Sequence, residues 1–145
     1  MKKLLLSALL GISSLAAFAN NRGTITNLLT CGAPMTIQFL EYDPGTCNYN
    51  GASPIYPYVA GQVYDLDDPT LWAPTPLLSY QSYSAIICIQ CAGVSFCLPP
   101  IGILGGAPPC DPTSVGPLLT PCCGKISATN NPPGGGGLSW NIDVN

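Results

Sequence analysis

The chain has 145 residues, of which only 4 are basic and 7 acidic, and it contains eight cysteines but no histidine. Histidine is the commonest general base and the commonest metal ligand, so its absence argues against most acid–base and metal-assisted catalysis. So few positive charges offer almost nothing to a phosphate backbone. We therefore expect no nucleic acid as a partner, no cofactor, and no enzymatic activity.

The first 19 residues have the pattern of a cleavable export signal. Lys2 and Lys3 precede an apolar run over residues 4–15, and small residues end the segment before Asn20. The run is shorter than the roughly 20 apolar residues that cross a bilayer. An uncleaved anchor is the alternative interpretation. We expect residues 1–19 to be removed and residues 20–145 to be secreted as one domain, to the extracellular space, the cell surface or the periplasm, without membrane insertion after cleavage.

Strand patterns dominate the chain from residue 24 to residue 98. Residues 24–26 and 35–42 alternate between apolar and polar side chains. A turn is expected at 43–46, followed by short or edge strands over 55–66, where proline and glycine interrupt the pattern. A hairpin is expected over 80–98, with its turn near 91–94. No window has a helical period with caps, so we predict an all-β chain that forms one disulfide-stapled β-sandwich of roughly six to nine strands.

The last third of the chain differs in composition. Residues 98–137 contain nine prolines and nine glycines, which makes regular structure improbable, so we expect loops that cysteines tie to the core. Residues 138–145 then alternate clearly, with Leu138, Trp140, Ile142 and Val144 on one face. This final strand either completes its own sandwich as an edge strand or adds to the open edge of a neighbouring copy.

The cysteines are interpreted as structural disulfides, because an export signal leads to an oxidising compartment. A turn between residues 92 and 93 places Cys88 opposite Cys97, and we predict that this pair is bonded. An extended strand separates Cys31 from Cys47, which disfavours a bond between them. The adjacent residues 122 and 123 are expected to have separate partners. All eight are assigned to disulfides: Cys31, Cys47, Cys88, Cys91, Cys97, Cys110, Cys122 and Cys123.

Two other patterns leave alternatives open. Cys88 and Cys91 have the spacing of a zinc ligand pair or of a catalytic dithiol, although both need reduced thiols. Asp65, Asp67 and Asp68 form the only carboxylate cluster. A turn closed by Pro69 explains that cluster without calcium or acid–base chemistry. We therefore predict no metal site.

Aromatic side chains suggest one candidate ligand site. Tyr56, Tyr58 and Trp72 fall in proline-interrupted segments that are expected to be exposed, where aromatic rings can stack on sugars. Packing in the core or at a sheet edge is the alternative use of these residues.

The opening of the mature chain resembles known secreted proteins. Residues 24–27, Cys31, residues 36–39 and residues 42–45 are similar to the start of small cysteine-containing secreted proteins of Bacteroidota-type bacteria, most of them uncharacterised, and to the first strand pair of thaumatin-like β-sandwiches. The resemblance implies an exported β-sandwich and assigns no functional residue.

Together these observations favour a noncatalytic, extracellular structural or surface-interaction protein that self-assembles through its C-terminal strand. Its partners would then be further copies of itself or an extracellular protein or carbohydrate. The alternative is an extracellular ligand-binding module, which would be carbohydrate-binding or inhibitor-like.

Overall fold

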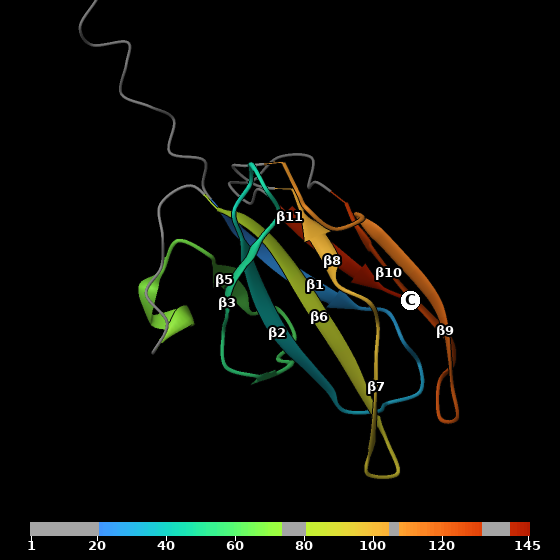
Figure 1. The fold of residues 1–145 in the computed structure, drawn as a ribbon. Helices are drawn as coiled ribbons and strands as arrows, with labels where there is room; N and C mark the ends of the chain where they lie inside the picture. The colour runs from blue at the N-terminus through green and yellow to red at the C-terminus, as the bar shows by residue number, and fades with distance from the viewer. Residues whose placement is uncertain (1–20, 74–80, 105–107, 132–139) are drawn as a thin grey trace, which may run out of the picture.

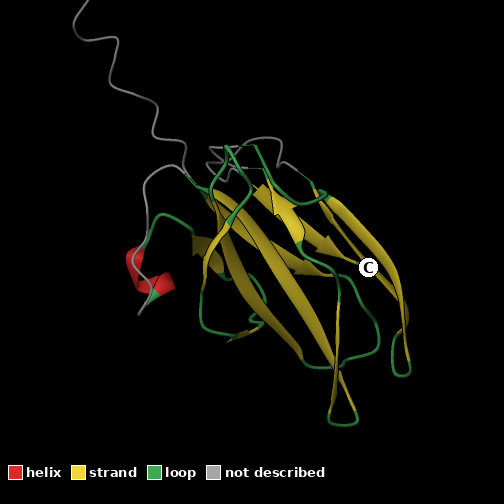
Figure 2. Ribbon diagram, viewed as in Figure 1, coloured by secondary structure: helices red, strands yellow, loops and turns green. Residues whose placement is uncertain are grey.

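The fold consists of two β-sheets that enclose one apolar core (Figures 1 and 2). The computed structural model describes residues 21–73, 81–104, 108–131 and 140–145. Apart from one 3-10 turn, η1 (Pro69–Trp72), the elements found in these ranges are strands, which confirms the all-β prediction. They are β1 (Arg22–Asn27), β2 (Met35–Tyr42), β3 (Tyr49–Ala52), β4 (Tyr56–Pro57), β5 (Val63–Asp65), β6 (Ser82–Cys91), β7 (Val94–Cys97), β8 (Ile101–Ile103), β9 (Ser114–Thr120), β10 (Gly124–Asn130) and β11 (Trp140–Val144).

The first sheet has five strands in the order β5-β1-β11-β10-β9. The strands β1 and β11 are parallel, in a register that runs from Gly23 opposite Trp140 to Asn27 opposite Val144. The other pairs in this sheet are antiparallel. Segments from the two ends of the described chain therefore lie side by side in one sheet.

The second sheet is built around the long strands β2 and β6. They pair antiparallel over the whole of β2, from Met35 opposite Ile89 to Tyr42 opposite Ser82. Short strands flank them: β3 and β4 pair with β2, and β7 and β8 pair with β6. The predicted hairpin with its turn at residues 92–93 is confirmed, since Cys91 lies opposite Val94.

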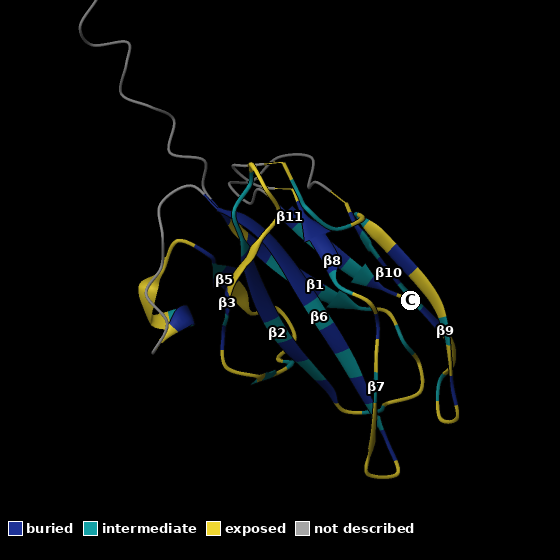
Figure 3. Ribbon diagram, in the orientation of Figure 1, coloured by how far each residue is buried: buried dark blue, intermediate teal, exposed yellow. Residues whose placement is uncertain are grey.

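The core lies between the sheets and follows from strand alternation. In β2 and β6 the odd-numbered residues point inward, whereas Gln38, Ile86 and Gln90, of even number, are only partly buried. The two long strands are mostly buried along their length (Figure 3). Aromatic rings bridge the two sheets, since Phe39 contacts Trp140 at a centroid distance of 6.1 Å and Tyr64 at 5.1 Å. The largest fully buried side chains are Trp72, Trp140, Tyr83, Phe39, Ile37, Leu66, Ile87, Ile89, Ile101, Ile103, Ile126 and Ile142.

The interpretation of the final strand as an edge strand is wrong. β11 has β1 on one side and β10 on the other, so it is an inner strand of its sheet. Trp140, Ile142 and Val144 are fully buried against the core, as their alternation requires. Leu138 lies outside the described residues.

The prediction of loops throughout residues 98–137 is also wrong, because β8, β9 and β10 lie in this segment. Among the described prolines of this segment, Pro117 is the one that lies within a strand, and that strand, β9, is the edge of its sheet and needs no donor on its open side. The residue pairs Leu118–Ile126 and Val115–Ala128 leave one extra residue on β9, so Gly116 and Pro117 form a bulge. A strand can therefore accommodate them. These short strands also bring the number in the described ranges to eleven, above the expected six to nine.

No helix in the described ranges has the length and apolar character to cross a membrane. The predicted export signal, residues 1–19, lies outside the described residues.

Candidate functional site

All eight cysteines are paired, in four disulfides. The predicted bond between Cys88 and Cys97 is confirmed, and it joins residues directly opposite each other on β6 and β7. The neighbours Cys122 and Cys123 have separate partners, as expected. The bonds are Cys31–Cys123, Cys47–Cys110, Cys88–Cys97 and Cys91–Cys122. Fully paired cysteines in a two-sheet fold are compatible with an oxidising or extracellular environment.

Two of these disulfides lie side by side at one end of the fold. Cys31 follows β1, Cys91 ends β6, and residues 122 and 123 form the turn between β9 and β10. The Sγ atoms of Cys122 and Cys123 are 3.6 Å apart. This pair of bonds fastens one tight turn of the five-stranded sheet to β6 of the other sheet and to the connection between β1 and β2.

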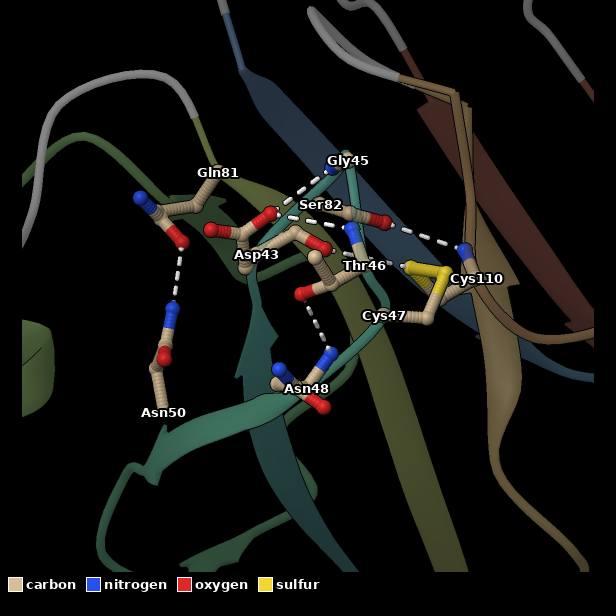
Figure 4. Close-up of a disulfide and its surroundings, with 9 residues drawn as sticks. All are labelled: Asp43, Gly45, Thr46, Cys47, Asn48, Asn50, Gln81, Ser82 and Cys110. Carbon is tan, nitrogen blue, oxygen red and sulfur yellow. Dashed lines mark hydrogen bonds between the residues drawn. A yellow bond between two sulfur atoms is a disulfide. The ribbon is translucent and has the colours of Figure 1, made fainter.

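The Cys47–Cys110 disulfide fastens the turn after β2 to the connection between β8 and β9 (Figure 4). Asp43 organises this turn, because its Oδ1 accepts hydrogen bonds from the backbone N–H groups of Gly45 at 2.8 Å and Thr46 at 3.0 Å. The backbone N–H of Cys110 donates to Ser82 Oγ at 3.0 Å, at the start of β6. The disulfide and these hydrogen bonds together fix the position of the turn. The presence of a turn at 43–46 is what the sequence pattern predicts.

A polar hollow of about 430 Å³ lies beside the edge strand β5. Its lining residues come from β1, β4, β5, η1 and the residues directly before β5 and η1, and they are Arg22, Tyr56, Gln62, Val63, Tyr64, Asp65, Asp68, Thr70 and Leu71. Arg22 Nε is 3.5 Å from Asp65 Oδ2. The hollow thus presents amide, hydroxyl, carboxylate and guanidinium groups, which can form hydrogen bonds with a polar ligand such as a sugar.

The electrostatics of the hollow follow from local hydrogen bonds. Asp68 caps η1: its Oδ1 accepts from Thr70 Oγ1 at 2.7 Å and Thr70 N at 2.8 Å. These two bonds lower the pKa of Asp68. Burial, and secondarily the negative charge of Asp68, raises the pKa of Tyr56, whose hydroxyl donates to the Leu71 carbonyl at 2.7 Å. Asp68 is therefore ionised and Tyr56 neutral at physiological pH.

An apolar groove of about 230 Å³ lies on the outer face of the six-stranded sheet. The Cys88–Cys97 disulfide contributes to its lining, and Ile55 beside it is 66% exposed. Amide groups also line it, since Gln90 Nε2 donates to Ser95 Oγ at 2.7 Å. The lining consists of Thr36, Ile37, Gln38, Ile55, Ile86, Cys88, Gln90, Ser95 and Cys97.

The aromatic candidates do not form an exposed platform. Trp72 is fully buried, its Nε1 donates to the Leu66 carbonyl at 2.9 Å, and its ring stacks on Tyr83, so its expected exposure is wrong. The 3-10 turn η1 directs Trp72 inward, which explains the difference. Tyr56 and Tyr58 are half-buried, and the Tyr58 hydroxyl accepts from the Asn27 N–H at 3.3 Å. Of the three residues, Tyr56 lines the polar hollow.

The carboxylate cluster behaves as the predicted turn. Asp65 ends β5, its Oδ1 accepts from the Asp67 N–H at 3.1 Å, and η1 begins at Pro69. Within the ranges that the structure describes, no three acidic, cysteine or histidine side chains are grouped as metal ligands.

Sequence reasoning missed a buried carboxylate. Glu41 is 1% exposed, although its side chain is ionisable, because it points to the same inner face of β2 as Phe39. Burial first, and then the charges of Asp67 and Glu41, raise the pKa of the core residue Tyr83. The alternation over 35–42 contained the signal, since extending the inward face by one step reaches Glu41.

The comparisons with known proteins give no relative. No protein-family model matches the chain, and neither the curated proteins nor the solved structures searched contain a match.

Proposed function

We propose that this chain is exported, loses residues 1–19, and acts as a noncatalytic structural or surface-interaction protein at the cell surface or in the extracellular space. The observation that carries the proposal is the arrangement of the four disulfides. Cys47–Cys110 fastens the turn after β2, and toward the opposite end of the sheets Cys88–Cys97 joins β6 to β7 while the other two bonds hold the β9–β10 turn. Such cross-links protect a fold that must persist outside the cell, typically by about 2–4 kcal/mol each.

Self-assembly through the C-terminal strand is part of the proposal, in a form that fits an inner strand. β11 fills the position between β1 and β10, so an assembled form would exchange residues 140–144 between copies and keep the same pairing. Exchange of an identical element is a low-cost route to dimers and longer assemblies.

Two measurements test this proposal. Fractionation of the producing cells should place the mature protein, beginning at Asn20, outside the cytoplasm. Negative-stain microscopy of the folded mature protein should show ordered assemblies. A mature protein that stays monomeric at high concentration would exclude self-assembly, and a cytoplasmic, unprocessed chain would exclude the structural role outside the cell.

A carbohydrate-binding module is the second candidate, and the polar hollow beside β5 favours it. Binding of the mature protein to a glycan array, lost on Gln62→Ala but kept in Gln90→Ala on the opposite sheet, would support this candidate. An array without signal would exclude it.

A further inference from the structure

We infer that the fold bears tension along its length through the parallel pair β1 and β11, and that the Cys31–Cys123 disulfide limits how far it can extend. This inference rests on the proposed structural role and specifies the physical load that the role involves. It is argued from strand direction, from side-chain contacts between the two strands, and from the path of the covalent chain.

The direction of the strands sets how force acts on them. Because β1 and β11 are parallel neighbours, the N-terminal end of β1 and the C-terminal end of β11 lie at opposite ends of the pair (Figure 1). A pull between Asn21 and Asn145 therefore slides β11 lengthwise past β1 and past β10, its other neighbour. Sliding stretches all of the ladder hydrogen bonds at once, whereas peeling would break them one by one. Resistance to forced unfolding is then set by the rate of this concerted step.

Side chains reinforce the same pair. On the outer face, Asn141 Oδ1 accepts from Thr24 Oγ1 at 2.8 Å and from Thr26 Oγ1 at 3.0 Å. At the N-terminal ends of both strands, the fully buried Trp140 donates a hydrogen bond from its Nε1 to the Asn21 carbonyl at 3.0 Å. Each of these contacts joins β11 to the β1 segment, so each must break before β11 slides.

The covalent path bypasses most of the domain. The Cys31–Cys123 bond spans a sequence separation of 92 residues. Once β1 and β11 separate, tension passes from residue 31 directly to residue 123. Only residues 21–31 and 123–145 can extend, and the chain between the two cysteines carries no load. At about 3.6 Å per residue, and after subtraction of the folded strand length, the extension gained is about 100 Å.

Breaking the Cys31–Cys123 disulfide and then the other disulfides lengthens the extension in defined steps. Without Cys31–Cys123, the next shortest path runs through Cys47–Cys110, and the total gain becomes about 200 Å. With every disulfide reduced, residues 21–145 extend fully, for a gain of about 420 Å. The first two lengths distinguish a molecule in which Cys31–Cys123 is intact from one in which Cys47–Cys110 carries the load.

Single-molecule force spectroscopy tests the inference on the exported protein, with handle domains fused before Asn20 and after Asn145. The oxidised protein should give one rupture with a gain of about 100 Å. Adding a dithiol should produce a second step to about 200 Å after the first, because the newly exposed Cys31–Cys123 bond is then reduced. In that step the dithiol sulfurs form a disulfide with each other, and the two cysteines leave as thiols. A Cys31→Ser/Cys123→Ser variant should reach about 200 Å in the absence of reductant.

A matched pair of substitutions tests where the force is borne. Asn141→Ala removes the acceptor shared by the two threonines, whereas Gln90→Ala removes a similar amide–hydroxyl contact to Ser95 inside the bypassed segment. Asn141→Ala should lower the rupture force, and Gln90→Ala should leave it unchanged. Equal effects of the two substitutions, or a first gain far above 100 Å in the oxidised protein, would overturn the inference. These measurements are made on isolated molecules and do not depend on localisation or assembly. The mechanical inference can therefore fail while the proposed function stands, and the proposed function can fail while the mechanical inference stands.

Discussion

Gly23→Ala should destabilise the fold strongly, because Gly23 lies directly beneath a tryptophan. The two residues are opposite each other on β1 and β11. A Cβ atom at position 23 would collide with the indole ring of Trp140 and with its backbone carbonyl. Trp140 is fully buried, is hydrogen-bonded to the Asn21 carbonyl and contacts the Phe39 ring, so it cannot move aside without losing these contacts.

The magnitude follows from those contacts. Overpacking a well-filled core costs about 1–3 kcal/mol, and loss of the indole hydrogen bond adds about 1 kcal/mol. The free energy of unfolding should therefore fall by about 2–4 kcal/mol, which corresponds to a decrease in Tm of roughly 8–16 °C for a domain of this size. Urea unfolding followed by tryptophan fluorescence measures the change, provided that the m-value is constant.

Two further variants isolate the cause. Gly45→Ala is the control, since the nearest atom to its added Cβ is the Asp43 carboxylate at 3.3 Å and its φ is not positive; we expect a change below about 0.5 kcal/mol. Trp140→Leu should cost less in a Gly23→Ala background than in the wild type, because the smaller side chain relieves the collision. A Gly23→Ala protein as stable as wild type would refute the β1–β11 register.

Three other outcomes are expected. The oxidised protein should incorporate no thiol-alkylating reagent before reduction, as mass spectrometry can measure, and one labelled cysteine would contradict the four-bond pattern. Loop entropy predicts that replacing Cys47 and Cys110 with alanine lowers the free energy of unfolding by about 4 kcal/mol, and replacing Cys88 and Cys97 by about 3 kcal/mol. The first pair costs more because it closes the longer loop. Denaturant titration of the two variants measures the order, and the reverse order would contradict this reasoning. Burial, together with a neighbouring carboxylate, raises the pKa of Tyr42 from 10.0 to about 12, so the stability it contributes is complete below pH 10 and lost as the pH rises to 12. Tyr42→Phe should make the unfolding free energy less dependent on pH in that window, and an unchanged slope would assign the dependence to other tyrosines.

Local patterns in the sequence were sufficient to predict the strands with regular alternation. Residues 35–42 and the hairpin that pairs Cys88 with Cys97 depend on contacts between near neighbours, and both were predicted correctly. The position of β11 could not be predicted in this way, because alternation shows which face of a strand is buried and not which strands lie beside it. Pro117 was misleading because its tolerance depends on β9 being at an edge, which is a property of the sheet.

For the cysteines, the sequence predicted that all eight form disulfides, but it identified only one of the four pairs, Cys88–Cys97. The other three bonds join turns whose proximity depends on how the two sheets pack. Trp72 was assigned to an exposed loop from its neighbouring prolines, yet the 3-10 turn that Asp68 caps directs it into the core. The polar hollow assembles residues from four separate elements, and no single segment contains a signal for it.

The inner position of β11 also determines when this protein can fold. β1 is synthesised before β11, so the position between β1 and β10 in the sheet stays empty until residues 140–144 have been made. Pairing of residues so distant in sequence is slow, because loop closure precedes any favourable contact. A nascent chain of this topology cannot complete its five-stranded sheet before β11 is made, which would suit passage through a narrow channel in the export proposed above. Under the export proposed above, this sheet would close after translocation, in the compartment where the four disulfides form.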